Sequence, residues 1–422
     1  MLARLLKLPL FRNAGIYTIG SLVNASIPFC LIPILTAHLS PESYGMIAMY
    51  TMFQGLMTPI VGMSSHSTIS VRYFNQDRFE FAKYLGNCFI ILGVSALFCL
   101  ALFYLFEPYL STYTLLKGKW LYSIIGVTFC LFLTQCILYI WQISQKPLNY
   151  IVFLVSMSLL NLSLSILFVV KLGANWEGRV GGQMLTLFLF ALISIIILWR
   201  KKLIKIQYDP KYIKDIAKLS FPLIPHSLAA ILFSITDRLV LTNVSGLEKT
   251  GVYTVAYQLG SLMLILTSSF NSAFVPWLFS NLKKEDHAIK IKIVKLTYAY
   301  FAVIWIIALI AILLLKYIIP FIVGPEFTKS SDYIVWIISG FALNGMYLMI
   351  TNYIFYAEKT YLLSIATVSV TLFNIGLCYY LVKLNGPIGA AQSSTISYFI
   401  YFLLSAYFCT KAYPMPWRLK NT

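Results

Sequence analysis

Long apolar runs follow one another along the whole chain. Most have about 20 residues or more, which is the length a helix needs to cross the hydrocarbon core of a bilayer. Few residues separate some neighbouring runs, so those pairs are predicted to form helical hairpins. The pattern predicts an all-α polytopic membrane protein with twelve spans. They cover residues 13–35, 44–68, 85–106, 120–143, 148–170, 178–199, 219–243, 250–272, 294–319, 331–356, 360–382 and 387–410.

Composition agrees with this class. Of the 422 residues, 59% are hydrophobic and 11% are charged, whereas a soluble domain has about 45–50% apolar and about 25% charged residues. An excess of 32 basic over 14 acidic residues would indicate nucleic-acid binding in a soluble protein. In a polytopic chain, cytoplasmic loops collect Lys and Arg, so no nucleic-acid partner is predicted.

The basic residues also predict the orientation. With the N-terminus inside, the inner segments hold 23 Lys and Arg and the outer segments hold 8. This bias places both termini in the cytoplasm. The one basic residue left over, 32 minus 31, is Arg238. The seven cysteines lie within apolar runs and form no CxxC or CxxH pattern, so neither a metal site nor a disulfide framework is predicted.

The chain contains a repeat. PESYGMIAMY at 41–50 resembles LEKTGVYTVA at 247–256, and QK at 145–146 precedes Asn161 much as EK at 358–359 precedes Asn374. The start of the sixth span from Gly178 also resembles that of the twelfth from Gly386. Six spans return the chain to its starting side, so two parallel six-helix lobes are predicted. The predicted parts are a first lobe at 1–199, a cytoplasmic linker at 200–218, a second lobe at 219–410 and a cytoplasmic tail at 411–422.

An acid and a base stand side by side in the seventh span. Asp237 lies eleven residues after His226, so at 100° per residue the two are about 20° apart around a helix. Ser227, Ser234 and Arg238 extend this polar stripe. A charge at the bilayer centre costs roughly 2.5–3.5 kcal/mol and usually faces a bundle interior or a watery cavity. Adjacent residues point about 100° apart, so the sequence does not require Asp237 and Arg238 to pair.

Polar stripes also mark the first, second and eighth spans. Their most informative members are Tyr17, Asn24, Gln54, His66, Tyr257 and Gln258. Small polar stripes serve as packing seams between membrane helices, and an ion pair can simply fix helix packing. Because the stripes recur across the repeat, we favour the alternative that spans 1, 2, 7 and 8 line a water-filled cavity.

Two blocks carry a family resemblance. Residues 11–56, which begin FRNAGIYTIG, are similar to the first two spans of the O-antigen (Wzx-type) flippases. TDRLVLTNVSGLEKTGVYTVAYQLGSL at 236–262 resembles their seventh and eighth spans. These flippases belong to the polysaccharide-exporter branch of the multidrug/oligosaccharidyl-lipid/polysaccharide (MOP) superfamily, which also includes the MATE transporters.

The resemblance implies two lobes in a MATE-like V shape and a place in the bacterial inner membrane. It implies a cargo, an undecaprenyl-diphosphate-linked oligosaccharide such as an O-antigen or capsule repeat unit, which is moved to the periplasmic leaflet. It also implies alternating access without a cofactor, driven by H⁺ or Na⁺, and a polysaccharide polymerase and a chain-length regulator as further partners. Because the family cavity is cationic, Arg238 and the inner-mouth residues Arg12 and Arg72 are candidate diphosphate contacts.

Two other functions remain open from the sequence. A drug or cation antiporter of the same superfamily would share the fold. A membrane polymerase or glycosyltransferase usually needs a sizeable outer loop, whereas the longest predicted outer connection here is 107–119. No GxxxxGK[ST], GxGxxG or HExxH motif is present, so no nucleotide site or zinc protease is predicted and the protein is predicted not to be an enzyme.

Overall fold

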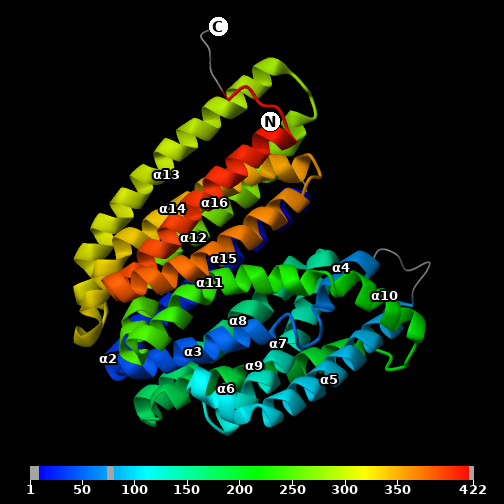
Figure 1. The fold of residues 1–422 in the computed structure, drawn as a ribbon. Helices are drawn as coiled ribbons and strands as arrows, with labels where there is room; N and C mark the ends of the chain where they lie inside the picture. The colour runs from blue at the N-terminus through cyan, green and yellow to red at the C-terminus, as the bar shows by residue number, and fades with distance from the viewer. Residues whose placement is uncertain (1–8, 74–79, 418–422) are drawn as a thin grey trace. The chain divides into compact units, whose positions relative to one another are not determined.

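The computed structural model describes residues 9–73 and 80–417, and these are almost entirely helical (Figure 1). The elements are α2 (Pro9–His38), α3 (Pro41–Met57), α4 (His66–Tyr73), α5 (Phe81–Leu105), α6 (Glu107–Thr114), α7 (Lys119–Ile143), α8 (Pro147–Ile166), η1 (Leu167–Lys171), α9 (Asn175–Arg200), α10 (Pro210–Ser220), α11 (Leu223–Ser245), α12 (Leu247–Leu282), α13 (His287–Ile322), η2 (Pro325–Ser330), α14 (Ser331–Tyr356), α15 (Tyr361–Asn385) and α16 (Pro387–Ala412).

Within the described residues, 10 helical segments are long and apolar enough to cross a membrane. They correspond to predicted spans 1 and 3–11. Predicted span 7 and the helix α10 together form one of these segments, Pro210–Ser245. The other two predicted spans fall on α3 with α4 and on α16, a helix of 26 residues. The all-α, multi-pass class is therefore confirmed, while the count of twelve and the sides of the termini stay predictions.

The chain divides into two compact units. The first unit comprises Met1–Leu39 and Met46–Ile231, and the second comprises Ser40–Gly45 and Leu232–Thr422. Each unit has one central helix. In the first, α7 contacts α4, α5, α8 and α9, and 56% of an 18-residue hydrophobic stretch of this helix is buried. In the second, α14 contacts α12, α13, α15 and α16, and 67% of the corresponding stretch of the segment Pro325–Tyr356 is buried.

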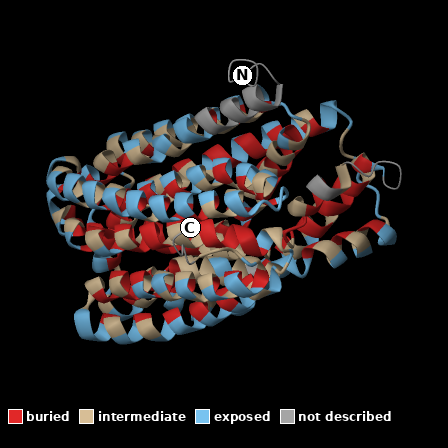
Figure 2. Ribbon diagram, turned by 90° about the horizontal axis from the view of Figure 1, so that it is seen from above, coloured by how far each residue is buried: buried red, intermediate tan, exposed pale blue. Residues whose placement is uncertain are grey.

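The surrounding helices keep large apolar side chains on the outside. Only 17% of the 18-residue hydrophobic stretch of α13 is buried, and only 11% of that of the segment Pro147–Lys171, which contains α8. Leu309, Leu313 and Phe321 of α13 are among the exposed residues. Figure 2 shows exposed residues in pale blue along many of the helices. Such a surface is stable only where lipid covers it, because water would leave the apolar area unburied.

The second predicted span is not one helix. The helix α3 ends at Met57, and α4 begins only at His66. Between them, Gly62 has a φ of 81°, and its amide donates a hydrogen bond of 2.8 Å to Ser95 Oγ. Pro59 offers no amide hydrogen to continue the ladder. The expectation that Gln54 and His66 share one continuous helical face was therefore wrong.

The repeat predicted from the sequence is visible in the backbone. Gln145 and Glu358, which differ by 213 (358 minus 145), both have positive φ, 51° and 57°. The next amide bonds back across the turn in each case, Lys146 N to Trp141 O and Lys359 N to Ile354 O. This is the C-terminal cap in which a left-handed residue lets an amide reach five residues back. The helices α7 and α14 therefore end in the same way.

The sixth and twelfth spans repeat in a different register from the one predicted. A Cβ on Gly178 would lie 3.0 Å from the backbone of Phe168, and one on Gly389 would lie 2.0 Å from Leu381 O. Both glycines thus let a helix approach the preceding one. The helices α9 and α16 begin and end at an offset of 212 (387 minus 175, and 412 minus 200), whereas the sequence aligned Gly178 with Gly386 at an offset of 208.

A reciprocal contact joins the starts of α3 and α12. A Cβ on Gly45 would lie 2.3 Å from Leu247 O, and one on Gly251 would lie 1.8 Å from Pro41 O. Both pairs are related by the same offset of 206 (251 minus 45, and 247 minus 41). Glycine is required at both positions because each helix backbone lies directly against the other. The segment Ser40–Gly45 therefore packs in the second unit.

Candidate functional site

Asp237 is held inside the second unit, on α11. Its side chain is 2% exposed, and Oδ2 accepts a hydrogen bond of 2.6 Å from the hydroxyl of Tyr253 on α12. The backbone amide of Arg238 donates to Oδ1 at 2.8 Å. Both carboxylate oxygens thus have a donor, which lowers the cost of burying a carboxylate.

Arg238 folds back along its own helix and does pair with Asp237. Its Nε lies 3.6 Å from Asp237 Oδ1, and Nη2 donates to the carbonyl of Ser234 at 2.6 Å. The guanidinium carbon lies 4.2 Å from the centre of the Tyr257 ring, a cation–π contact. A long, flexible side chain thus overcomes the 100° separation of adjacent positions. Nε itself is buried and makes no hydrogen bond within the described residues.

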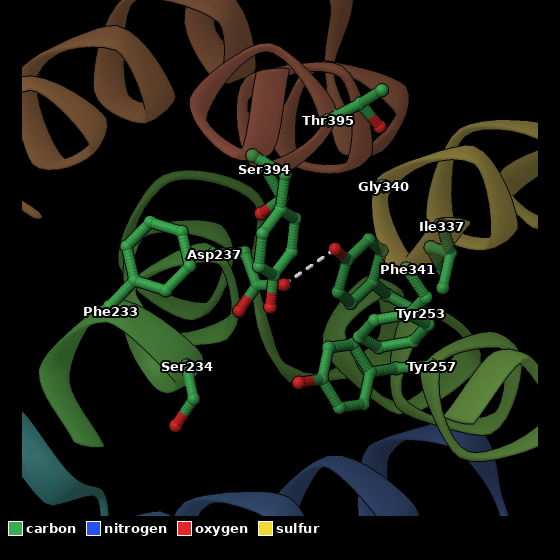
Figure 3. Close-up of a pocket in the computed structure, with 11 residues that line it drawn as sticks. Phe233, Ser234, Asp237, Tyr253, Tyr257, Ile337, Gly340, Phe341, Ser394 and Thr395 are labelled. Atoms are coloured by element: carbon green, nitrogen blue, oxygen red, sulfur yellow. Dashed lines mark hydrogen bonds between the residues drawn. The ribbon is translucent and has the colours of Figure 1, made fainter. Parts of the chain in front are cut away.

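A narrow cavity borders Asp237 (Figure 3). Its volume is only about 10 Å³. That is room for about one water molecule. The dashed line in Figure 3 marks the bond from Tyr253 to Asp237. The lining residues are Phe233, Ser234, Asp237, Tyr253, Tyr257, Ile337, Gly340, Phe341, Ser394, Thr395 and Tyr398.

The aromatic rings around this cavity form a connected cluster. Phe233 and Tyr398 meet edge to face with ring centres 5.1 Å apart, and Phe341 and Tyr257 do so at 5.4 Å. Sequence reasoning found Asp237, Arg238, Ser234 and Tyr257, but it missed Tyr253, Phe233 and Tyr398. For Tyr253 a signal existed: it lies four residues before Tyr257, on the same helical face.

Gln258 is engaged elsewhere in the second unit. Its Oε1 accepts a hydrogen bond of 2.6 Å from the hydroxyl of Tyr44. Tyr44 belongs to the segment Ser40–Gly45 that packs with this unit. The bond therefore strengthens the contact between the start of α3 and α12 that the paired glycines make.

The predicted residues of the first unit each bond a different neighbouring helix. Asn24 Oδ1 accepts from Ser158 Oγ at 2.6 Å. Gln54 Oε1 accepts from Gln183 Nε2 at 3.0 Å.

His66 stacks on Tyr139 with ring centres 5.6 Å apart and meets Phe132 edge to face at 5.5 Å. In this conformation the side chains of Asn24, Gln54 and His66 contact other residues of the first unit. Their contact with a cargo stays a prediction. The side chains of Arg12, Tyr17 and His226 lie outside the described residues.

Arg72 is neutralised by the segment between the two halves. Asp215 of α10 accepts from its Nε at 2.9 Å and from Nη2 at 2.6 Å, and Tyr84 also donates to Asp215 at 3.0 Å. The hydrogen bond to Asp215 raises the pKa of the Arg72 guanidinium, a group that is always charged in proteins. Arg72 therefore forms an ion pair with Asp215 in this conformation. The sequence did not predict this pair.

The ion pair between Arg72 and Asp215 is expected to hold α10 against α4. The variant Asp215→Asn removes a charged acceptor whose hydrogen bonds contribute about 1.5–3 kcal/mol. If α10 detaches locally, its backbone amides should exchange with deuterium roughly ten- to a hundredfold faster, measured by mass spectrometry on peptides from 210–220. Lys214→Gln, an exposed change on the same helix, is the matched control. Unchanged exchange in Asp215→Asn would show that α10 is held by its apolar face alone.

The fold and the buried pair describe the class of protein before any family is considered. The chain is a multi-pass, all-helical protein with internal repeats and an ion pair inside its second half. Two solved structures share this fold. An inward-facing multidrug resistance MATE family transporter of the MOP superfamily aligns with a TM-score of 0.73 at 15% identity, covering 94% of both chains. The lipid II flippase MurJ in an inward closed conformation aligns at 0.71 and 17%, covering 94% of this chain and 88% of that chain.

Sequence comparison then gives the family. The model of the polysaccharide biosynthesis protein family matches residues 10–283. The chain belongs to this family, which confirms the resemblance to the polysaccharide-exporter branch. Two curated relatives come from Haemophilus influenzae. The Lsg locus protein 1 is 24% identical over 417 residues, covering 94% of this chain and 98% of the relative. An uncharacterized membrane protein is 24% identical over 377 residues, covering 87% and 89%.

Proposed function

We propose that this protein is a flippase for an undecaprenyl-diphosphate-linked oligosaccharide, an O-antigen or capsule repeat unit. It moves this lipid from the cytoplasmic to the periplasmic leaflet of a bacterial inner membrane by alternating access. Membership of the polysaccharide biosynthesis protein family supports a saccharide cargo. A fold shared with a lipid II flippase supports a lipid-linked one.

The comparison between the two halves carries the proposal. The offset of 206 that relates Gly45 to Gly251 also relates Asp237 to Leu31 and Arg238 to Ile32 (237 minus 31 is 206). Leu31 and Ile32 are 4% and 3% exposed. One hydrogen bond recurs at this offset: Thr36 donates to Ile32 O and Thr242 to Arg238 O, each at 2.8 Å. The first half therefore fills the position with apolar side chains. The repeated fold does not require charges there, which favours a role in binding or coupling.

Arg238 is the proposed contact for the diphosphate. Its guanidinium is oriented by Asp237, Ser234 and Tyr257, and it keeps one buried donor, Nε, without a hydrogen bond in the described structure. Guanidinium groups bind phosphate oxygens with strong, directional hydrogen bonds. The amide and phenol side chains of Asn24, Gln54, Gln258 and Tyr257 are proposed to meet the sugars, while the polyprenyl chain stays in lipid.

The proposal requires a conformational change. The cavity beside Asp237 holds about one water molecule, so a sugar reaches Arg238 only when α11 separates from its neighbours. Such motion is the basis of alternating access. An H⁺ or Na⁺ gradient drives the cycle in this proposal, and Asp237 is the buried carboxylate available for coupling. A polymerase and a chain-length regulator would act on the flipped product.

Two alternatives fit less well. A polymerase would need a large outer loop, and the predicted outer connection 107–119 instead contains the short helix α6. A drug antiporter shares the fold, but the family match over residues 10–283 favours a saccharide cargo.

A substitution at Arg238 tests the site. Arg238→Ala should abolish most surface polysaccharide, because both the anion contact and the partner of Asp237 are lost. Arg238→Lys keeps the charge but not the planar contact on Tyr257, and we expect partial activity. Surface polysaccharide is measured in a strain that lacks the native copy, at protein levels matched by immunoblot. Normal polysaccharide in Arg238→Ala would remove Arg238 from the cargo site.

A further inference from the structure

A second cavity lies in the first unit, on the outside of its bundle. It is an open groove of about 450 Å³ between α7, α8 and α9. Its lining is predominantly apolar. The lining residues are Trp141, Leu148, Asn149, Val152, Phe153, Ser156, Phe190 and Ile193. None of them belongs to the site around Asp237.

The groove has a fixed floor and an open rim. Trp141 and Phe153 meet edge to face with ring centres 5.3 Å apart, and Phe153 meets Phe190 in the same way at 4.9 Å. These three residues are buried, whereas Leu148 is 64% and Val152 is 63% exposed. Interlocked aromatic rings hold the floor in shape. An extended apolar chain could therefore lie along it without rearranging the bundle.

Basic side chains stand at one end of the groove. The Lys201 ammonium lies 6.0 Å from the centre of the Trp141 ring. Lys146 is close in the fold, because its amide donates to Trp141 O at 2.8 Å. Arg200 and Lys202 flank Lys201, and all four of these side chains are exposed. The basic end is thus the end at which α7 and α9 finish.

The N-terminus of α8 adds to this positive field. Lys146 is its N-cap residue, and no side chain in the described structure caps it. The first amides of a helix point outward and favour an anion. An anionic group at this end would therefore meet Lys146, Lys201 and the start of α8, directly beside the apolar groove.

We propose that this groove binds an anionic phospholipid of the bilayer, with one acyl chain on the aromatic floor and the phosphate headgroup at Lys146 and Lys201. The apolar groove and the basic end match the two parts of such a lipid. By the distribution of Lys and Arg this end faces the cytoplasm, where anionic headgroups bind basic pockets between membrane helices. The site is separate from the cargo site and does not depend on the cargo proposed above.

The test is lipid binding to the full-length protein in detergent. Phosphatidylglycerol and phosphatidylcholine with identical acyl chains are added, and bound lipid is counted by native mass spectrometry. We expect phosphatidylglycerol to bind at least tenfold more tightly than phosphatidylcholine. The double variant Lys146→Glu/Lys201→Glu should remove this preference, and the groove-filling variant Val152→Phe should weaken binding of both lipids.

A matched control comes from the second half. Lys359 corresponds to Lys146 (359 minus 146 is 213), and its Nζ lies 3.4 Å from the carbonyl of Lys411. The variant Lys359→Glu/Lys411→Glu makes the same charge change there and should keep the preference for phosphatidylglycerol. Equal binding of the two lipids to the unaltered protein, or equal loss in both double variants, would overturn the proposal. Preferential binding of undecaprenyl phosphate in competition with phosphatidylglycerol would overturn the choice of ligand.

Discussion

The triple variant Asp237→Leu/Arg238→Ile/Tyr253→Phe is expected to fold and to lose polysaccharide export completely. It copies Leu31 and Ile32 of the first half into the second and removes the Tyr253 hydroxyl that would otherwise lose its acceptor. Replacing a buried ion pair by apolar residues of similar volume is often neutral or stabilising by about 1–4 kcal/mol. Export depends on the charges in our proposal, so stability and function should separate in this variant.

Single substitutions provide the contrast. Arg238→Ile leaves the buried carboxylate of Asp237 without its cation, and breaking a buried pair in this way costs about 3–5 kcal/mol. Thermal unfolding of the purified variants should therefore rank Arg238→Ile well below the triple variant. Surface polysaccharide should be lost in both. A triple variant that still exports polysaccharide would assign the pair to packing, and the proposed cargo site would then be wrong.

Among the glycines of the described residues, Gly251 is the one at which substitution by alanine is expected to be most disruptive. Its new Cβ would lie 1.8 Å from Pro41 O, which is a backbone atom and cannot rotate away. Either α3 and α12 separate or the helices shift, and overpacking of this kind costs typically about 1–3 kcal/mol and occasionally more. The midpoint of thermal unfolding, measured by fluorescence-detected size exclusion, should fall clearly below that of the unaltered protein.

Two further alanine variants calibrate this result. Gly45→Ala makes the reciprocal clash, 2.3 Å from Leu247 O, and should behave in the same direction. Gly126→Ala adds a methyl group with nothing within 4 Å, so it should be neutral or slightly stabilising, because alanine favours the helix. If Gly251→Ala and Gly126→Ala unfolded at the same temperature, the close approach of α3 and α12 would be refuted.

Local features of the sequence were sufficient for the class and for part of the site. Asp237 and Arg238 were found because two charges inside an apolar run cost free energy in any arrangement of helices. The repeat was found because Gly45 and Gly251 sit in similar decapeptides. Tyr253, Phe233 and Tyr398 were missed because 29 Tyr and 30 Phe residues are spread through the chain, and an aromatic residue in an apolar span carries no sign of its partner.

The break after Met57 was missed for a related reason. Pro59 and Gly62 were visible, but both residues are tolerated inside membrane helices, so the apolar run alone favoured a continuous span. The register of α9 against α16 likewise depended on how closely each helix approaches the one before it.

By itself the sequence determined a multi-pass helical chain, its internal repeat and the unusual pair at Asp237 and Arg238, because span length and charge are properties of neighbouring residues. Only the tertiary structure decided that Arg238 lies on Tyr257, that Arg72 pairs with Asp215, and that Gly251 meets Pro41. Each of these contacts joins residues that lie on different helices. Their geometry is therefore set by packing rather than by spacing along the chain.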